Sequence, residues 1–341
     1  MVRHTSARRL PPARPTLTAR SMTPAAGRAL LWLAFTAVAV PAHAWPDKPI
    51  RMVAVSAPGG STDLLARMYA SRLGPLLGQQ ILIDNRAGGG GMIASELVAR
   101  APADGHTLLF THTSHSVLPS MHSRLPYDPF DDFSPIGLVA LTHSVLLVAP
   151  GVQARSVKEL IEQARARPGQ MNYGAGSTGA SAHLAGELFK LMARVDIVHV
   201  PYKGTGAQLA ALLGNEIQMS FSTVPAAMPH IQAGRLRALG VGSPNRASAL
   251  PDVPTVSEAG LPGFDVSAWN GVLGPARTPV AIVNRINREL AEIARQPETR
   301  EKAAAQGTDL VSGTPQEFAA YIKSQIAKWS KVVRAAGIQP D

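Results

Sequence analysis

Two glycine-rich loops constrain the fold of this chain more than any other feature. The first, Pro58-Gly-Gly-Ser-Thr-Asp63, follows the apolar run over residues 50–55, and the second, Gly176-Ser-Thr-Gly-Ala-Ser181, follows another strand-like segment. Each loop opens a helical pattern of apolar residues. Strand, loop and helix units in series predict an α/β fold with parallel strands, in which ligands bind at the carboxyl ends of the strands.

Both loops have the features of an anion-binding helix start. Backbone N–H groups in the first turn of a helix have no partner inside the helix, and the helix dipole adds positive potential there. The Ser and Thr hydroxyls supply further hydrogen-bond donors. For either loop alone, an ordinary capped helix start is the alternative. Because one such loop occurs in each half of the chain, we expect an anion held from two sides.

A dinucleotide cofactor is the other ligand that the second loop suggests. Gly174, Gly176 and Gly179 match the G-x-G-x-x-G spacing that cradles a pyrophosphate. That site also needs an acidic residue about 20 residues further on, at the end of the next strand. Asp196 has nearly this spacing, but it precedes the strand predicted over residues 197–200. We therefore expect no cofactor.

The positive charge of the chain is concentrated at its N-terminus. The formal net charge is +10, but residues 1–44 hold six arginines and no lysine or carboxylate, so that 27 basic and 23 acidic residues remain after them. This balance gives no indication of a nucleic-acid partner. The apolar run over residues 29–40 is followed by Ala42-His43-Ala44, a small-x-small cleavage site. Residues 1–44 are thus predicted to be a cleavable signal peptide for export to the periplasm.

Two alternatives remain at this terminus. An uncleaved membrane anchor is disfavoured because the apolar run is shorter than the roughly 20 residues that span a bilayer. Translation from Met22 would give a signal of more ordinary length.

Catalytic and metal sites are not expected. The chain has no cysteine, which excludes thiolate ligands. His112-x-x-His115 could be a pair of metal ligands, but no paired carboxylate stands at ligand spacing. Ser177 lacks the G-x-S-x-G context of a serine nucleophile. We therefore expect a protein that binds without turnover.

Many short motifs of the chain, in order, closely resemble the Bug family, the periplasmic solute-binding proteins of tripartite tricarboxylate transporters. The resemblance covers residues 45–341. It is carried by Trp45-Pro-Asp-Lys-Pro-Ile-Arg51, Pro58-Gly-Gly-Ser-Thr-Asp63, Asp84-Asn-Arg-Ala-Gly88, Pro102-Ala-Asp-Gly-His-Thr-Leu-Leu109, Leu125-Pro-Tyr-Asp128, His183-Leu-Ala-Gly-Glu-Leu-Phe189, His199-Val-Pro-Tyr-Lys-Gly204, Leu250-Pro-Asp-Val-Pro-Thr255 and Ala259-Gly-Leu-Pro-Gly263.

The resemblance implies an α/β, two-domain periplasmic-binding-protein fold of type II, a Venus flytrap with a central sheet in each domain. Domain 1 would be discontinuous, residues 45–146 and 268–341, and domain 2 would be residues 147–267. The implied function is that of a monomer that captures a small carboxylate between its domains and delivers it to membrane permease subunits. An exported ligand sensor for a membrane receptor, or an exported hydrolase, is the alternative.

The ligand-binding residues that the resemblance implies come from both loops and from two further positions. They are Gly59, Gly60, Ser61, Thr62, Asp63, His115, Ser177, Thr178, Gly179, Ser181, Ser222 and Thr223.

The chain also departs from the family pattern in the region expected to line the rest of the pocket. Leu118 and His122 replace the usual asparagine and tyrosine, Ser222-Thr223 replaces a common Asp-Asn, and Met92 replaces a common asparagine. These changes predict a distal pocket that is less acidic and more apolar than usual.

Overall fold

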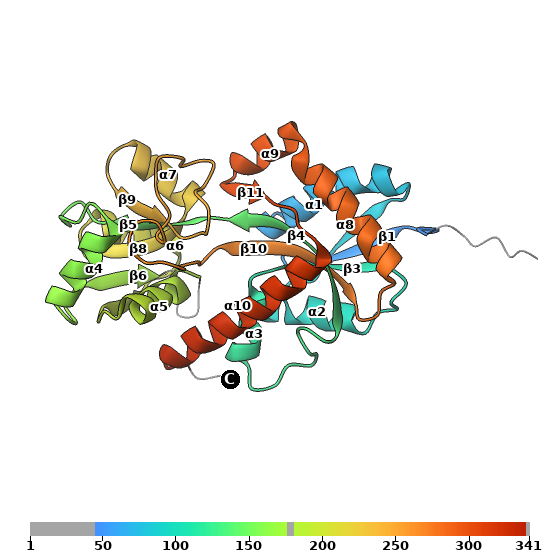
Figure 1. The fold of residues 1–341 in the computed structure, drawn as a ribbon, viewed down its shortest axis with the longest axis horizontal. Coiled ribbons are helices and arrows are strands. Elements are labelled where there is room, and N and C mark those ends of the chain that lie inside the picture. Colours follow the sequence, from blue (N-terminus) through green and yellow to red (C-terminus); the bar gives the residue numbers. More distant parts are fainter. Residues whose placement is uncertain (1–44, 176–180, 339–341) are drawn as a thin grey trace, which may run out of the picture. The chain divides into compact units, whose positions relative to one another are not determined.

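Two β-sheets and the helices around them make up the computed structural model, which describes residues 45–175 and 181–338 (Figure 1). The predicted signal peptide and the loop residues 176–180 lie outside these ranges. Over the described residues, none of the helices combines the length and the apolar character needed to cross a bilayer.

The first sheet has six strands in the order β11-β4-β10-β3-β1-β2. Its strands are β1 (Ile50–Ala54), β2 (Ile81–Asn85), β3 (Thr107–His112), β4 (Phe133–Thr142), β10 (Ala268–Pro275) and β11 (Thr308–Leu310). The chain segments around it form α1 (Ser61–Leu77), the 3₁₀ turn η1 (Gly89–Gly91), α2 (Met92–Ala99), α3 (Ser114–Met121), α8 (Val280–Arg295), α9 (Pro297–Ala304) and α10 (Pro315–Ala335).

The second sheet has five strands in the order β7-β6-β8-β5-β9. Its strands are β5 (Ser144–Val148), β6 (Asn172–Ala175), β7 (Val198–Pro201), β8 (Met219–Thr223) and β9 (Arg237–Val241). Its helices are α4 (Val157–Ala166), α5 (Ser181–Ala193), α6 (Thr205–Leu213) and α7 (Val224–Gln232).

The prediction of parallel sheets is correct for only part of each sheet. Strand β1 is parallel to β2 and β3, and β6 is parallel to β7 and β8. In contrast, β10 is antiparallel to β3 and β4, β11 is antiparallel to β4, and β5 is antiparallel to β8 and β9. The reason is that β5 and β10 are reached directly from the other sheet, without the crossover helix that a parallel connection requires.

The chain passes from the first sheet to the second at His143, the single residue between β4 and β5 (Figure 1). It returns through residues 242–267, which lead from β9 into β10. The crossing at His143 lies three residues before the predicted boundary at 146. The domain boundaries themselves stay a prediction.

Helix α10 packs against elements of both sheets. Phe318 and Ile322 near its start belong to the same apolar cluster as Val53 of β1. Trp329, one turn beyond the middle of the helix, is buried in the cluster that contains β5 and β8. The C-terminal helix therefore connects the two cores in addition to the strand crossings.

Candidate functional site

A cavity of about 400 Å³ is lined by elements from both sheets. The part of the chain around the first sheet contributes Ser61 and Thr62, at the start of α1, and His112, at the end of β3, to the cavity lining. Ser181 at the start of α5 and Thr223 at the end of β8 contribute from the second. The cavity thus lies at the carboxyl ends of strands, where α/β folds bind their ligands.

A larger hollow of about 850 Å³ runs along α1 and β2. It is open to solvent, and Arg67 is the one charged residue of its described lining. No helix start and no cluster of hydroxyls faces it, so we take the smaller cavity as the candidate site.

The first predicted loop forms an uncapped helix start. Gly59 has a φ of 81°, a conformation that favours glycine, and this turn delivers the chain to Gly60 at the N-cap of α1. No side chain caps this end of the helix. The first backbone N–H groups of α1 have no partner within the helix, so they are available to an anion.

The side chain of Asp63 stabilises this loop through hydrogen bonds. Its carboxylate is 1% exposed and accepts hydrogen bonds from Gly59 N (2.9 Å), Arg67 Nε (3.0 Å) and Asn85 Nδ2 (2.8 Å). Burial by itself raises the pKa of Asp63, but the hydrogen bonds from Arg67, Gly59 and Asn85 outweigh it and lower the pKa. The structure therefore holds this carboxylate as an anion whose acceptors are already used.

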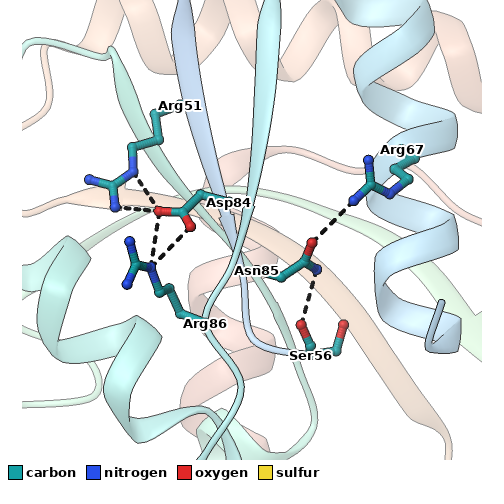
Figure 2. A network of polar contacts seen from close by, with 6 residues as sticks. All are labelled: Arg51, Ser56, Arg67, Asp84, Asn85 and Arg86. Carbon is teal, nitrogen blue, oxygen red and sulfur yellow. Dashed lines mark hydrogen bonds and ion pairs between the residues drawn. The ribbon is translucent and has the colours of Figure 1, made fainter. Parts of the chain in front are cut away.

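Asn85 also hydrogen-bonds to Ser56, two residues beyond the end of β1. Figure 2 shows its side chain between Arg67 and Ser56. Its amide nitrogen donates to Ser56 O at 3.0 Å, and its amide oxygen accepts from Arg67 Nη2 at 3.1 Å. In the same view, Asp84 is bound between Arg51 and Arg86. The conformation of the first loop is thus fixed by polar contacts with β2.

The structure brings three of the predicted ligand hydroxyls to one cavity. Those of Ser61, Ser181 and Thr223 are exposed, line the cavity, and have no hydrogen-bond partner within the described part of the chain. Each stands at a helix start: Ser61 opens α1, Ser181 opens α5, and Thr223 is the N-cap of α7. Thr62, also predicted, lines the cavity and receives a long contact from Asn270 Nδ2, at 3.4 Å.

Ser222, the neighbouring predicted residue, lies beside a small extension of the cavity. This extension has a volume of about 60 Å³ and shares Thr142, Ser181 and Thr223 with the main cavity. Ser222 is 4% exposed, and its hydroxyl has no partner in the described structure. The extension brings a further polar group close to the start of α7.

Four of the predicted residues, Gly59, Gly60, Asp63 and His115, are not among the residues that line the main cavity. Ser177, Thr178 and Gly179 fall outside the described residues. His115 is 1% exposed and packs against the rings of Tyr127 and Phe133, with centroids 6.2 and 5.0 Å away. The structure therefore places His115 in the core of the first sheet's helical layer.

Sequence reasoning missed His112, which lines the cavity where His115 does not. Its Nδ1 accepts a hydrogen bond from the backbone N–H of Ser114 at 3.2 Å, and burial lowers the pKa of its ring. The ring is therefore neutral near pH 7 and carries its proton on Nε2. His112 is the last residue of β3, and this position could have indicated that it lines the ligand cavity, because ligands bind beyond the carboxyl ends of strands.

The rest of the described lining is apolar or neutral. The apolar side chains Val117, Leu184 and Val266 and the rings of Trp269 and Trp329 are part of it, and no Lys, Arg, Asp or Glu is among the described residues that line the cavity. No set of three or more His, Asp or Glu side chains in residues 45–175 and 181–338 is placed to hold a metal ion. The arrangement can hold an anion through helix starts and hydroxyls, beside a surface suited to an apolar group.

Comparisons with known proteins agree with this arrangement. The chain is 37% identical to the protein BugT of Bordetella pertussis. The match extends over 311 residues, which are 90% of this chain and 95% of the relative. Among solved structures, an R. palustris protein with adipate is 36% identical, with a TM-score of 0.68, over 87% of this chain and all of that one. MatC from Rhodopseudomonas palustris with bound malate is 30% identical, with a TM-score of 0.64, over 84% and 99% of the two chains.

These likenesses confirm the predicted α/β periplasmic-binding-protein fold with two sheets. They also confirm the resemblance to the Bug proteins that the motifs indicated. The model of one family, described as the tripartite tricarboxylate transporter family receptor, matches residues 65–338. The chain belongs to this family of solute-binding receptors.

Proposed function

We propose that this protein captures a small carboxylate in the cavity between its two sheets and delivers it to the membrane permease subunits of a tripartite tricarboxylate transporter. It would do so in the periplasm, after removal of residues 1–44, as a monomer and without catalysis. The observation that carries the proposal is the convergence of Ser61, Ser181 and Thr223 on one cavity. Each offers a spare hydroxyl beside a helix start.

The electrostatics of the site favour one negative charge over a neutral ligand. The N-terminal ends of α1, α5 and α7 all carry the positive end of a helix dipole. Hydrogen bonds from neutral donors to a charged group are each worth about 1.5–3 kcal/mol. A carboxylate can use such donors from both sides at once, whereas an amide accepts through one oxygen only.

Closure is the second part of the proposal. With domain 1 assigned to residues 45–146 and 268–341, and domain 2 to residues 147–267, the cavity lining comes from both domains. A ligand that binds groups of both domains has a higher affinity for the closed state, and this difference drives closure. The permease would then receive the closed, loaded form.

Relatives of known ligand support the choice of a carboxylate. The R. palustris structures contain adipate in one case and malate in the other. This chain is 36% identical to the first of them and 30% identical to the second.

A thermal-shift screen of the purified protein against small carboxylates tests the proposal. Ligand at about a hundred times its dissociation constant should add roughly 2.7 kcal/mol to the free energy of unfolding. The primary amide of the best acid is the matched control, and we expect it to bind at least tenfold more weakly. Equal stabilisation by acid and amide, or turnover of the bound compound, would contradict the proposal.

A further inference from the structure

Both connections between the two sheets reach one buried histidine. His143, the single residue between β4 and β5, is 3% exposed. Its Nδ1 lies 2.7 Å from Oγ of Ser243, which is two residues beyond the end of β9 in the returning connection. The hydroxyl of Ser243 in turn donates to Asn245 O at 2.8 Å. The imidazole therefore joins the first connection to the second.

Asp309, in the edge strand β11 of the first sheet, binds both connections as well. Its Oδ2 lies 2.8 Å from His143 Nε2, and its Oδ1 accepts from the hydroxyl of Ser248, within the returning connection, at 2.7 Å. Burial by itself raises the pKa of Asp309, but the hydrogen bonds from His143 and Ser248 outweigh it and lower the pKa. Asp309 is therefore an anion near pH 7, and the His143 nitrogen that faces it carries a hydrogen. His143, Ser243, Ser248 and Asp309 form what we call the hinge network.

The start of α7, where Thr223 reaches the cavity, contacts residues of this network or their neighbours. The backbone oxygen of His143 accepts from Val224 N, one residue after Thr223, at 3.1 Å. The turn at Gly307, two residues before Asp309, packs against the same helix start. A Cβ at Gly307 would lie 2.5 Å from Pro225 Cδ. The position of Thr223 is thus set by His143 and by the chain that leads into β11.

Most of the hinge network lies outside the ligand cavity. Ser243, Ser248 and Asp309 line neither the main cavity nor its small extension, whereas His143 lines the extension. An effect of those three residues on ligand affinity must therefore come through the position of other groups. Two-domain binding proteins close by movement at the connections between their domains. Contacts that join these connections limit the arrangements that the two sheets can adopt.

We infer that Asp309 and His143 are positioning residues, which join both connections to β11 and keep Thr223 where one ligand can bind it and Ser61 together. The inference rests on the proposed carboxylate binding and closure, and it names the residues that limit the movement. Without these contacts, the sheets adopt a wider range of arrangements, of which fewer can bind. If the competent fraction falls about tenfold, the apparent affinity falls by the same factor.

Distances between two spin labels test the inference in the protein without ligand. The chain has no cysteine, so labels can be attached through Glu162→Cys on α4 and Glu301→Cys on α9, both exposed positions. Asp309→Ala should give a wider distribution of distances than the labelled protein without this change. Asp104→Ala is the matched control and should not, because its carboxylate also lies beside a histidine, His106, but outside both connections. An unchanged distribution in Asp309→Ala would overturn the inference and leave the proposed function intact.

A double-mutant cycle tests whether Asp309 acts through Thr223. With adipate, or with malate if adipate does not bind, we expect Asp309→Ala to bind at least tenfold more weakly by calorimetry. Asp309→Asn has one acceptor oxygen for two contacts that use different oxygens, so its affinity should lie between. Thr223→Val removes the hydroxyl and should lower the affinity by a smaller factor in Asp309→Ala than in the wild type. Equal factors in both backgrounds, or wild-type affinity in Asp309→Ala, would overturn the inference.

Discussion

The carboxylate of Asp63 accepts a hydrogen bond from the side-chain amide of Asn85 at 2.8 Å, which ties the first loop to the edge strand β2. Asp63 is 1% exposed, and the same carboxylate also receives Gly59 N–H. The acidic residue of the loop therefore acts on the loop itself. It fixes the turn from which Ser61 and Thr62 reach the cavity.

Replacing Asp63 by alanine should lower both stability and affinity. The substitution removes hydrogen bonds to a charged group that are each worth about 1.5–3 kcal/mol. It leaves the Gly59 N–H without its partner and the Asn85 amide nitrogen with Ser56 O alone. Urea unfolding measures the loss, and calorimetry with the best carboxylate should show weaker binding. Asp131→Ala, at an exposed carboxylate far along the chain, is the control and should change neither. Wild-type affinity in a destabilised Asp63→Ala protein would show that the loop keeps its shape without this support.

Acid should destabilise the protein through His115 before the carboxylates titrate. Burial lowers the pKa of this ring from 6.5 to about 4, while its Nε2–H donates to Pro129 O and its Nδ1 has no partner in the described structure. The unfolded chain then binds a proton more readily than the folded one. The stability that this residue contributes is complete above pH 6.5 and is lost as the pH falls from 6.5 through 4.

The loss from His115 alone should reach about 2 kcal/mol at pH 5. Urea unfolding of the wild type and of His115→Phe at pH 7.5 and pH 5 measures it. The variant lacks the hydrogen bond to Pro129 O, so it should be less stable at pH 7.5, yet its stability should fall less between the two pH values. Parallel losses in both proteins would assign the acid sensitivity to other groups.

A pair of glycines should respond in opposite directions to alanine. A Cβ at Gly271 of β10 would lie 2.3 Å from Phe318 Cζ of the buried α10 ring, so Gly271→Ala forces the core apart. Overpacking of this kind costs about 1–3 kcal/mol. A Cβ at Gly206 of α6 would meet no atom within 4 Å, so Gly206→Ala should stabilise by about 0.4–1 kcal/mol. Denaturant unfolding of the two variants distinguishes them, and stabilisation by Gly271→Ala would mean that α10 can move away from β10.

Much of the fold could be predicted from the sequence, because local patterns decide the elements beside the loops. The apolar run before Pro58 is β1, and the amphipathic pattern after it is α1. Strands β4 and β10 could not be found in this way. Pro135 and Gly137 interrupt β4, and Gly271 and Gly274 interrupt β10, so neither shows the apolar pattern of a strand. Gly271 is explained only by the ring of Phe318, which comes from a helix far along the chain.

The candidate site could also be predicted from the sequence only in part. The helix starts at Ser61 and Ser181 could be predicted, since hydroxyl residues immediately before an apolar helical pattern mark the beginning of a helix. Which of two nearby histidines faces the cavity could not. His112 ends β3, while His115 lies in the first turn of α3 and turns toward Tyr127 and Phe133. That choice depends on the packing of a helix whose partners come from later in the chain.

Removing the hydroxyl of Ser61 should weaken carboxylate binding by the value of one hydrogen bond. The hydroxyl lines the cavity and has no other partner in the described structure, so Ser61→Ala should lose about 1.5–3 kcal/mol of binding free energy with little effect on unfolding. Ser71→Ala on the same helix is the matched control, because Ser71 Oγ donates to Met68 O and lies outside this cavity. Calorimetry with acid and amide should show the loss for the acid alone. An equal loss for both ligands would mean that Ser61 contacts an uncharged part of the ligand.

A branched side chain at Gly60 should abolish binding while leaving the fold largely intact. Gly60 has a φ of −70°, which any residue can adopt, so the backbone does not itself require glycine. A Cβ there would lie 3.3 Å from Ala57 O, a close contact that alanine can tolerate. The two methyl groups of valine would in addition cover the first N–H groups of α1, where the anion must approach the backbone. We therefore expect Gly60→Ala to bind the best carboxylate within about tenfold of wild type, which is a loss of no more than about 1.4 kcal/mol of binding free energy. Gly60→Val should show no binding by calorimetry. Circular dichroism should confirm that both variants are folded. Wild-type affinity in Gly60→Val would show that the first loop is an ordinary helix start and that the carboxylate is held elsewhere in the cavity.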